Sequence, residues 1–152
     1  MYMDGMDILD QKILTLLIGN ARLSYSEIGE KVGISRVAVK SRVKALEEKG
    51  IIEEYTTVID PGKISGVVSC YFEIETRPEA METVVDELRK NETVTQIYRV
   101  TGKSHLHVHA VASGNGEMEY FITHVLDKIP GIVRLESHAI LARVKDVKGL
   151  RL

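Results

Sequence analysis

The sequence predicts an α+β chain with two parts, one helical over residues 1–60 and one with β-α-β-β-α-β order over residues 67–152. Apolar residues recur at helical spacing before residue 60, whereas β-type runs alternate with helical runs after it. Between the two parts lies DPGKISG, a turn-rich stretch, and we expect residues 61–66 within it to form a linker. A length of 152 residues has room for two small domains of this kind.

Three helices and a strand are expected in the first part. An apolar stripe predicts a helix over residues 7–18. Ser24 and Glu27 have the spacing of a capping box, which predicts the start of a second helix. Ser35 can cap a third helix, and the β-branched residues at 51–60 predict a strand or wing after it. The stripe of the first helix consists of Ile8, Leu9, Ile13, Leu16 and Leu17.

The third helix carries a local concentration of positive charge. No acidic residue occurs from residue 31 to residue 46, although the net charge of the whole chain is −2. The basic residues there are Lys31, Arg36, Lys40, Arg42 and Lys44. Val39, Val43 and Leu46 share the face that we expect to be buried. A helix, a glycine-containing turn and a basic helix are typical of the helix-turn-helix, whose second helix enters the major groove of DNA.

The predicted DNA contacts lie on this third helix and at its N-terminal cap. Lysine and arginine neutralise phosphates, and residues near the start of the helix can reach base edges. The alternative is a solvated basic face in a small helical bundle, but the turn spacing and the segregation of charge favour DNA. The predicted contact residues are Ser35, Arg36, Val37, Lys40, Ser41, Arg42 and Lys44.

The order of elements in the second part is that of a ferredoxin-like split βαβ arrangement, one sheet with both helices on one face. The expected strands are residues 67–76, 94–102, 105–113 and 133–144, and the expected helices are residues 78–91 and 116–129. The other sheet face would be open in a monomer, which predicts association of two copies. Tyr71, His107, His109 and Ile140 are expected to lie on that open face.

Three histidines alternate in the stretch GKSHLHVHA. Alternation places His105, His107 and His109 on one face of a strand, and Glu73 and Glu75 on the neighbouring strand could share it. Two imidazoles and a carboxylate make a metal site one hypothesis. The favoured interpretation is that the histidines pack and hydrogen-bond in a dimer interface, because no cysteine or second close histidine pair completes a site.

Composition indicates the compartment. The chain has one cysteine, Cys70, so no internal disulfide can form, and we expect Cys70 to be a buried core thiol in a reducing interior. The start of the chain lacks the charged and apolar regions of a signal peptide. No apolar run approaches the length of a membrane span. We therefore expect a cytoplasmic protein without a membrane partner.

Six segments distributed along the chain carry a resemblance: DILDQKILTLL, ARLSYSEIGEKVGIS, VKSRVKALEEKGII, YTTVIDPGKISG, VTGKSHLHVHAVA and IPGIVRLESHAIL. Through them nearly the whole chain resembles the leucine-responsive regulatory protein/AsnC family, the feast/famine regulators. The resemblance implies a DNA-binding transcription factor with a winged helix-turn-helix domain and no catalytic activity. It also implies dimers through the second domain, further assembly into octamers, and a small molecule, commonly an amino acid, bound between dimers. No other cofactor is expected.

The resemblance also implies where the effector binds. The expected residues are Gly102, Lys103, Ser104 and His105 in one loop, together with Ser137. Many members have an aspartate where this chain has His105, and two threonines where it has Leu135 and Ser137. These departures leave open a different ligand, a different pose or none.

Three alternatives to an effector-sensing regulator remain open. One is a regulator that responds to metal through His105, His107 and His109. Another is a haem-pathway decarboxylase, since some of these enzymes resemble the same two-domain architecture, although the strongly basic third helix argues against it. The last is a DNA-bridging protein without a ligand.

Overall fold

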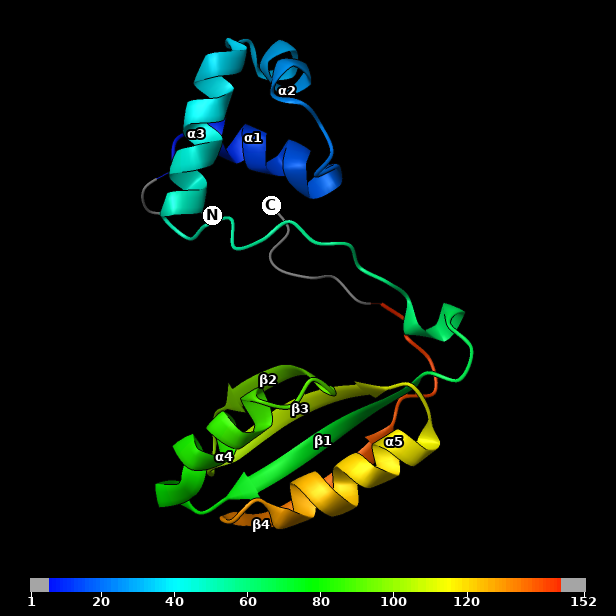
Figure 1. Cartoon of the computed structure of the whole chain (residues 1–152). Helices are drawn as coiled ribbons and strands as arrows, with labels where there is room; N and C mark the ends of the chain where they lie inside the picture. Colours follow the sequence, from blue (N-terminus) through cyan, green and yellow to red (C-terminus); the bar gives the residue numbers. More distant parts are fainter. Residues whose placement is uncertain (1–5, 146–152) are drawn as a thin grey trace. The chain divides into compact units, whose positions relative to one another are not determined.

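The computed structural model describes residues 6–145, which form two compact units that meet in the sequence between Val58 and Ile59 (Figure 1). Each unit has its own hydrophobic core. Part of the expected linker, Pro61–Lys63, forms the short 3-10 helix η1 at the beginning of the second unit. Residues 1–5 and 146–152, which the expected domains include, lie outside the described residues.

The first unit contains the three expected helices, α1 (Ile8–Gly19), α2 (Tyr25–Val32) and α3 (Arg36–Glu48). The Ser24–Glu27 capping box is confirmed, because each side chain accepts from the other residue's backbone N–H. Ser35 caps α3 as expected, with its Oγ accepting from Ala38 N. Ile8 departs from the expected apolar stripe, being 72% exposed in the first turn of α1.

The expectation of a strand at residues 51–60 is wrong. Backbone N–H groups of Ile51 and Ile52 donate to Leu46 O at the end of α3, and no β-ladder forms from there to residue 60. Strand propensity measures how well a side chain packs on a partner strand, and this unit offers no partner among its described residues. Tyr55 instead donates its hydroxyl to Glu47 Oε1 at 2.9 Å, and burial together with that carboxylate raises the pKa of Tyr55 to about 12.

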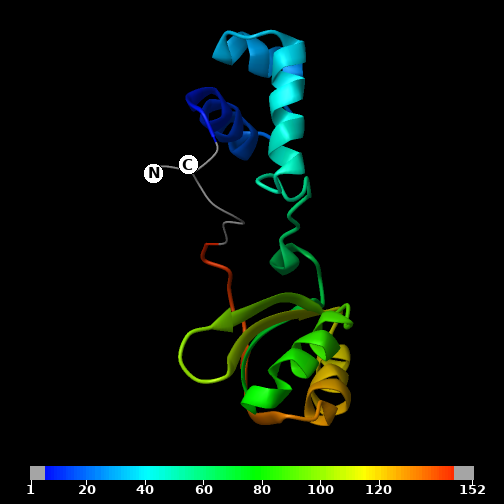
Figure 2. The same cartoon turned by 90° about the vertical axis from the view of Figure 1, so that its left-hand side faces the viewer.

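The second unit is a four-stranded antiparallel sheet in the order β2-β3-β1-β4, with α4 and α5 on one face (Figures 1 and 2). This confirms the ferredoxin-like arrangement. Its elements are β1 (Val68–Thr76), η2 (Pro78–Ala80), α4 (Met81–Arg89), β2 (Val94–Val100), β3 (His105–Ala112), α5 (Asn115–Tyr120), η3 (Phe121–Val125), η4 (Leu126–Lys128) and β4 (Ile132–Ala139).

The last strand is shorter than expected and ends at Ala139 rather than at residue 144. Ala139 pairs with Cys70, and Ile140 N still donates to Ser69 O at 2.9 Å. Because β1 itself begins at Val68, the partner strand ends at this point and the ladder cannot continue.

The second helical region is one run with three hydrogen-bond patterns. α5 passes into a π-helical segment, η3, and then into the 3-10 segment η4. Phe121 at the start of the π segment and Leu126 just after it are both buried, and Phe121 contacts Phe72 edge to face at 5.9 Å between ring centroids.

Strand alternation separates the sheet into an inner and an open face. Phe72, Ile74, Leu106 and Val108 are fully buried against the helices. Cys70 belongs to the same core, as expected, and burial raises the pKa of its thiol. Over the described residues, no helix has the length and apolar character needed to cross a membrane.

Candidate functional site

The turn between α2 and α3 depends on two glycines. Gly33 adopts φ 76°, a left-handed conformation that suits glycine and ends α2. Gly33 N and Ile34 N both donate to Gly29 O. Gly29 is buried, and a Cβ there would lie 2.5 Å from Ile34 O. The absence of a side chain at Gly29 therefore lets the backbone of the turn, at Ile34, pack closely against α2.

The buried face of α3 is as expected, with Val39, Val43 and Leu46 packed inside the unit. The opposite face is exposed and carries Arg36, Val37, Lys40, Ser41 and Lys44. Val37 is 76% exposed near the start of the helix, although it is apolar. Within residues 6–145, the one ion pair on this face joins Lys44 Nζ to Glu48 Oε1 at 3.5 Å, one turn along the helix. The face therefore keeps most of its positive charge available to an anionic partner.

Arg42 lies apart from the other predicted DNA contacts. Its Nη1 lies 2.6 Å from Asp7 Oδ2 and 2.8 Å from Asp10 Oδ1, which joins α3 to the start of α1. The hydrogen bonds to Asp10 and then Asp7 raise the pKa of Arg42. The pKa of Asp7 is lowered, first by the backbone N–H of Asp10 and then by Arg42. The capping box between Asp7 and Asp10, not recognised in the sequence, was the signal for this contact.

The histidines lie together on the open face of the sheet, as expected. Tyr71 lies among three of them, with ring centroids 5.2 Å from His107, 5.1 Å from His109 and 6.2 Å from His138. Burial, and then the charge of Glu73, raise the pKa of the Tyr71 hydroxyl. The open face thus has an aromatic and imidazole centre.

Glu73 and Glu75 share this face with the histidines, as expected. Glu73 pairs in register with His107 and Glu75 with His105, and His105 Nε2 lies 3.6 Å from Glu75 Oε2. Within residues 6–145, however, no group of three histidine, cysteine or acidic side chains could hold a metal ion. The structure therefore gives no support to a metal site within a single copy of the chain.

The predicted effector residues do not all come together in one chain. Gly102 adopts φ 110° in the turn between β2 and β3, and Ser104 O accepts from Thr76 N at 2.8 Å. Lys103 Nζ and His105 Nε2 each lie 3.6 Å from Glu75, so both side chains lie toward the open face. Ser137 pairs in register with Phe72 and therefore belongs to the helix-facing side.

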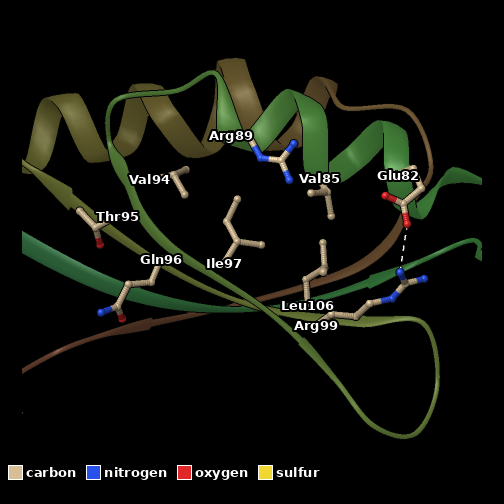
Figure 3. A pocket seen from close by; sticks show the side chains of 9 residues that line it. All are labelled: Glu82, Val85, Arg89, Val94, Thr95, Gln96, Ile97, Arg99 and Leu106. Carbon is tan, nitrogen blue, oxygen red and sulfur yellow. Dashed lines mark hydrogen bonds and ion pairs between the residues drawn. The ribbon is translucent and has the colours of Figure 1, made fainter. Parts of the chain in front are cut away.

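A cleft that was not expected from the sequence lies between α4 and β2, with a volume of about 380 Å³ (Figure 3). Its lining residues are Glu82, Val85, Arg89, Val94, Thr95, Gln96, Ile97, Arg99 and Leu106. Arg99 pairs in register with the buried Leu106, so the side chain of Arg99 leaves β2 on the face that is covered by the helices. A charged residue at a core-facing position of an edge strand was the available signal.

Each of the two units matches a known protein family. The profile described as winged helix-turn-helix DNA-binding matches residues 6–53, and the profile described as Lrp/AsnC ligand binding domain matches residues 69–150. The transcriptional regulator LrpA of Pyrococcus horikoshii is 37% identical over 140 residues, which cover 91% of this chain and 99% of the relative. The regulator Ptr1 of Methanocaldococcus jannaschii is 37% identical over 98 residues, covering 64% of this chain and 66% of the relative.

Solved structures agree with these matches. A transcriptional regulator of Neisseria meningitidis, in complex with L-Met, superposes with a TM-score of 0.84 at 25% identity over 95% of this chain and 96% of that one. Escherichia coli AsnC superposes with a TM-score of 0.85 over 99% of this chain and 100% of that one, and its 22% identity bears on the fold alone.

Proposed function

This chain belongs to the Lrp/AsnC family of helix-turn-helix transcriptional regulators, and on that premise we propose that α3 reads DNA and that the second unit adjusts DNA binding in response to a small molecule. The exposed face of α3 carries this proposal, because it holds Arg36, Lys40 and Lys44 within a stretch that has no acidic residue from 31 to 46. A positive face of this kind on the second helix of a helix-turn-helix fits the charge of the DNA backbone.

Different residues of α3 would contact the phosphates and the bases of DNA. Lys40 and Lys44 would neutralise phosphates, while Arg36 and Val37 lie near the helix start, where base edges are within reach. The exposed Val37 side chain suits contact with a thymine methyl group. The remaining predicted contacts are Ser35, whose hydroxyl can still donate while its oxygen caps α3, together with Ser41 and Arg42.

Binding to the chain's own promoter region tests this proposal. Its affinity should exceed that for an unrelated duplex of equal length by roughly 10³-fold or more at one fixed salt concentration. Equal affinities for the two duplexes would reduce the function to non-specific DNA coating and would contradict sequence-specific regulation.

The open sheet face would form the dimer. Tyr71 and the histidines around it present a mixed aromatic and polar surface that a second copy can cover by two-fold symmetry. A dimer places two recognition helices on half-sites separated by whole turns of DNA. Octamers would form by further association of such dimers.

The effector would be a small molecule, most simply an amino acid, as in the L-Met complex of the Neisseria relative. We place it at Gly102, Lys103, Ser104 and His105, with Ser137 supplied by another copy because it lies on the opposite side of its own sheet. Calorimetry of amino acids with the parent, His105→Ala and His107→Ala tests the placement. A loss of affinity with His105→Ala alone is expected, and unchanged affinity in both variants would remove this loop from ligand binding.

Its place in the cell and its chemistry follow from this function. A regulator of transcription works where the chromosome lies, so we place the chain in the cytoplasm without a membrane partner. It would act by binding rather than by catalysis and without a resident cofactor. If no small molecule changes its DNA affinity, the DNA-bridging alternative takes the place of the sensor.

A further inference from the structure

The cleft between α4 and β2 is lined by apolar and by polar or charged side chains in similar measure. Val85 of α4, Val94 and Ile97 of β2 and Leu106 of β3 supply apolar lining, and Figure 3 shows these side chains between the helix and the strands. A volume of about 380 Å³ lies within the range of small-molecule sites. The cleft therefore has room for a metabolite with a short hydrocarbon chain.

An ion pair limits one end of the cleft. Arg99 Nη1 lies 3.0 Å from Glu82 Oε1 and joins β2 to α4, as Figure 3 shows. The lining holds two guanidinium groups, those of Arg89 and Arg99, and the single carboxylate of Glu82, so its net charge is positive. A ligand in this cleft is therefore better recognised through an anionic group than through a cationic one.

Arg89 supplies a cation for such a group. In Figure 3 its guanidinium lies over Ile97, between Val94 and Val85. It bonds to Asp86 through Nη1 at 3.0 Å, one turn earlier on the same helix. A guanidinium carries five N–H donors in a planar fork that fits a carboxylate, so Arg89 can bind a ligand while keeping this bond.

We infer that the cleft between α4 and β2 binds a small carboxylic acid with an apolar side chain, a hydrophobic amino acid or the corresponding 2-oxo acid. The carboxylate lies on Arg89 and the side chain on Val85, Val94 and Ile97. This inference rests on the proposed function, that the second unit senses a small molecule, and it adds a site distinct from the turn at Gly102.

The position of the cleft connects it to that turn. Arg99 directly precedes Val100, the last residue of β2. After Val100 the chain enters the turn that leads to His105, the first residue of β3. A ligand that holds α4 against β2 therefore acts on the strand that carries the turn. Occupation of the cleft can in this way alter the surface where another ligand or another copy binds.

Calorimetry on the full chain tests the inference with L-leucine, 4-methyl-2-oxopentanoate and isoamylamine, which lacks the carboxylate. Both acids should bind and the amine should not. Arg89→Gln should weaken both acids about tenfold or more, since it removes a charge-assisted contact. The matched control is Arg77→Gln, an exposed arginine paired with Glu79 outside the cleft, and it should bind both acids as the parent does.

Backbone amide shifts of the ¹⁵N-labelled chain locate the bound acid. An acid bound in the cleft should change the amide shifts of residues 94–99, and changes confined to residues 102–105 would place the acid at the turn instead. Failure of both acids to bind, equal binding of the amine, or parent-like affinity of Arg89→Gln would each overturn the inference.

Variants at the two places distinguish this inference from the proposed function. If His105→Ala removes acid binding and Arg89→Gln does not, the sensor stands and the cleft is excluded. If the acids bind at the cleft but leave promoter affinity unchanged, the cleft stands and regulation by these acids is excluded.

Discussion

The exposed face of α3 and the open face of the sheet are both rich in charge, yet they treat it differently. On this exposed face of α3, which excludes Arg42, Arg36 and Lys40 have no ion-pair partner among the described residues, and Lys44 lies near Glu48. On the sheet, Glu75 and Glu136 lie beside basic side chains, whereas Glu73 lies opposite Glu136 in the strand register. Glu75 is within 3.6 Å of Lys103 and His105, and Glu136 contacts Arg134 and His138.

The difference indicates two kinds of partner. Cations without carboxylate neighbours attract a polyanion, and releasing its counterions supplies free energy that depends on salt. Pairing of Glu75 with Lys103 and of Glu136 with Arg134 reduces the net field of the sheet face, because opposite charges that lie close together cancel one another at a distance. Such a face can be covered by a second copy of itself.

Tyr71→Glu should break the open face most strongly. The change places a carboxylate at the centre of the histidine cluster, where a second copy would bury it beside Glu73. We expect the dimer dissociation constant to rise about 100-fold or more, measured by light scattering across a concentration series. Tyr120→Glu is the control, because this exposed tyrosine stacks on His124 in the helical layer. A Tyr71→Glu chain that stays dimeric at micromolar concentration would exclude this interface.

The double variant Lys40→Ala, Lys44→Ala tests whether the exposed face of α3 contacts DNA phosphates. Loss of two phosphate contacts should reduce the slope of log affinity against log salt by about two, and affinity about 30-fold at 0.15 M salt. The fold should persist, since both side chains are exposed. Lys63→Ala with Lys128→Ala removes the same charge from exposed positions of the second unit and should leave the slope unchanged. An unchanged slope in the first pair would show that α3 does not face the DNA backbone.

Gly29→Ala alters the turn that presents α3 without touching its charge. The new Cβ would meet Ile34 O, a backbone atom, and we expect a loss of about 1–2 kcal/mol in the stability of the first unit by thermal unfolding. Gly19→Ala is the control, because a Cβ there meets no atom within 4 Å and the residue ends α1. Equal unfolding temperatures for the two variants would mean that the close approach at Gly29 is not needed.

Most of the fold could be predicted because local signals agreed with the tertiary structure. The capping box at Ser24 indicates the start of a helix, and the alternation of Leu106 and Val108 with the histidines indicates a strand with one buried face. The strand expected at 51–60 failed because β-branched residues form a strand only where a partner strand is present, and sequence periodicity does not reveal the partner.

The sites were less predictable, since they depend on contacts between distant segments. The contact of Arg42 with Asp7 and Asp10 could not be predicted, because more than thirty positions separate Arg42 from these carboxylates in the sequence. The cleft beside Arg89 exists only once α4 lies on β2. By contrast, the side on which Ser137 lies could have been found by counting alternate residues from Leu135.

The smallest expected effect is a change in the acid stability of the first unit, the unit that contains α3. In the folded unit the pKa of Asp7 lies below its ordinary value of 3.8. The stabilisation that ionised Asp7 gives the folded unit is therefore fully present above pH 3.8 and is lost as the pH falls through the lower pKa of the folded state. Asp7→Asn should therefore lower the unfolding temperature slightly at neutral pH and flatten its decline on acidification toward pH 3. If parent and variant decline in parallel, the contacts of Asp7 with Asp10 N and Arg42 do not contribute to stability.

The π-helical segment η3 has a consequence for how such a chain tolerates insertions and deletions. In a π turn the N–H reaches back five residues, so Phe121 and Leu126 lie one above the other and both enter the core. In an α-helix, two side chains lie one above the other when they are four residues apart in the sequence. Removing the exposed Thr123 would convert the segment to ordinary helix and keep both side chains inside, whereas the same deletion within α4 would turn Met81 or Leu88 away from the sheet. Over evolution, length changes in this layer should therefore concentrate at η3.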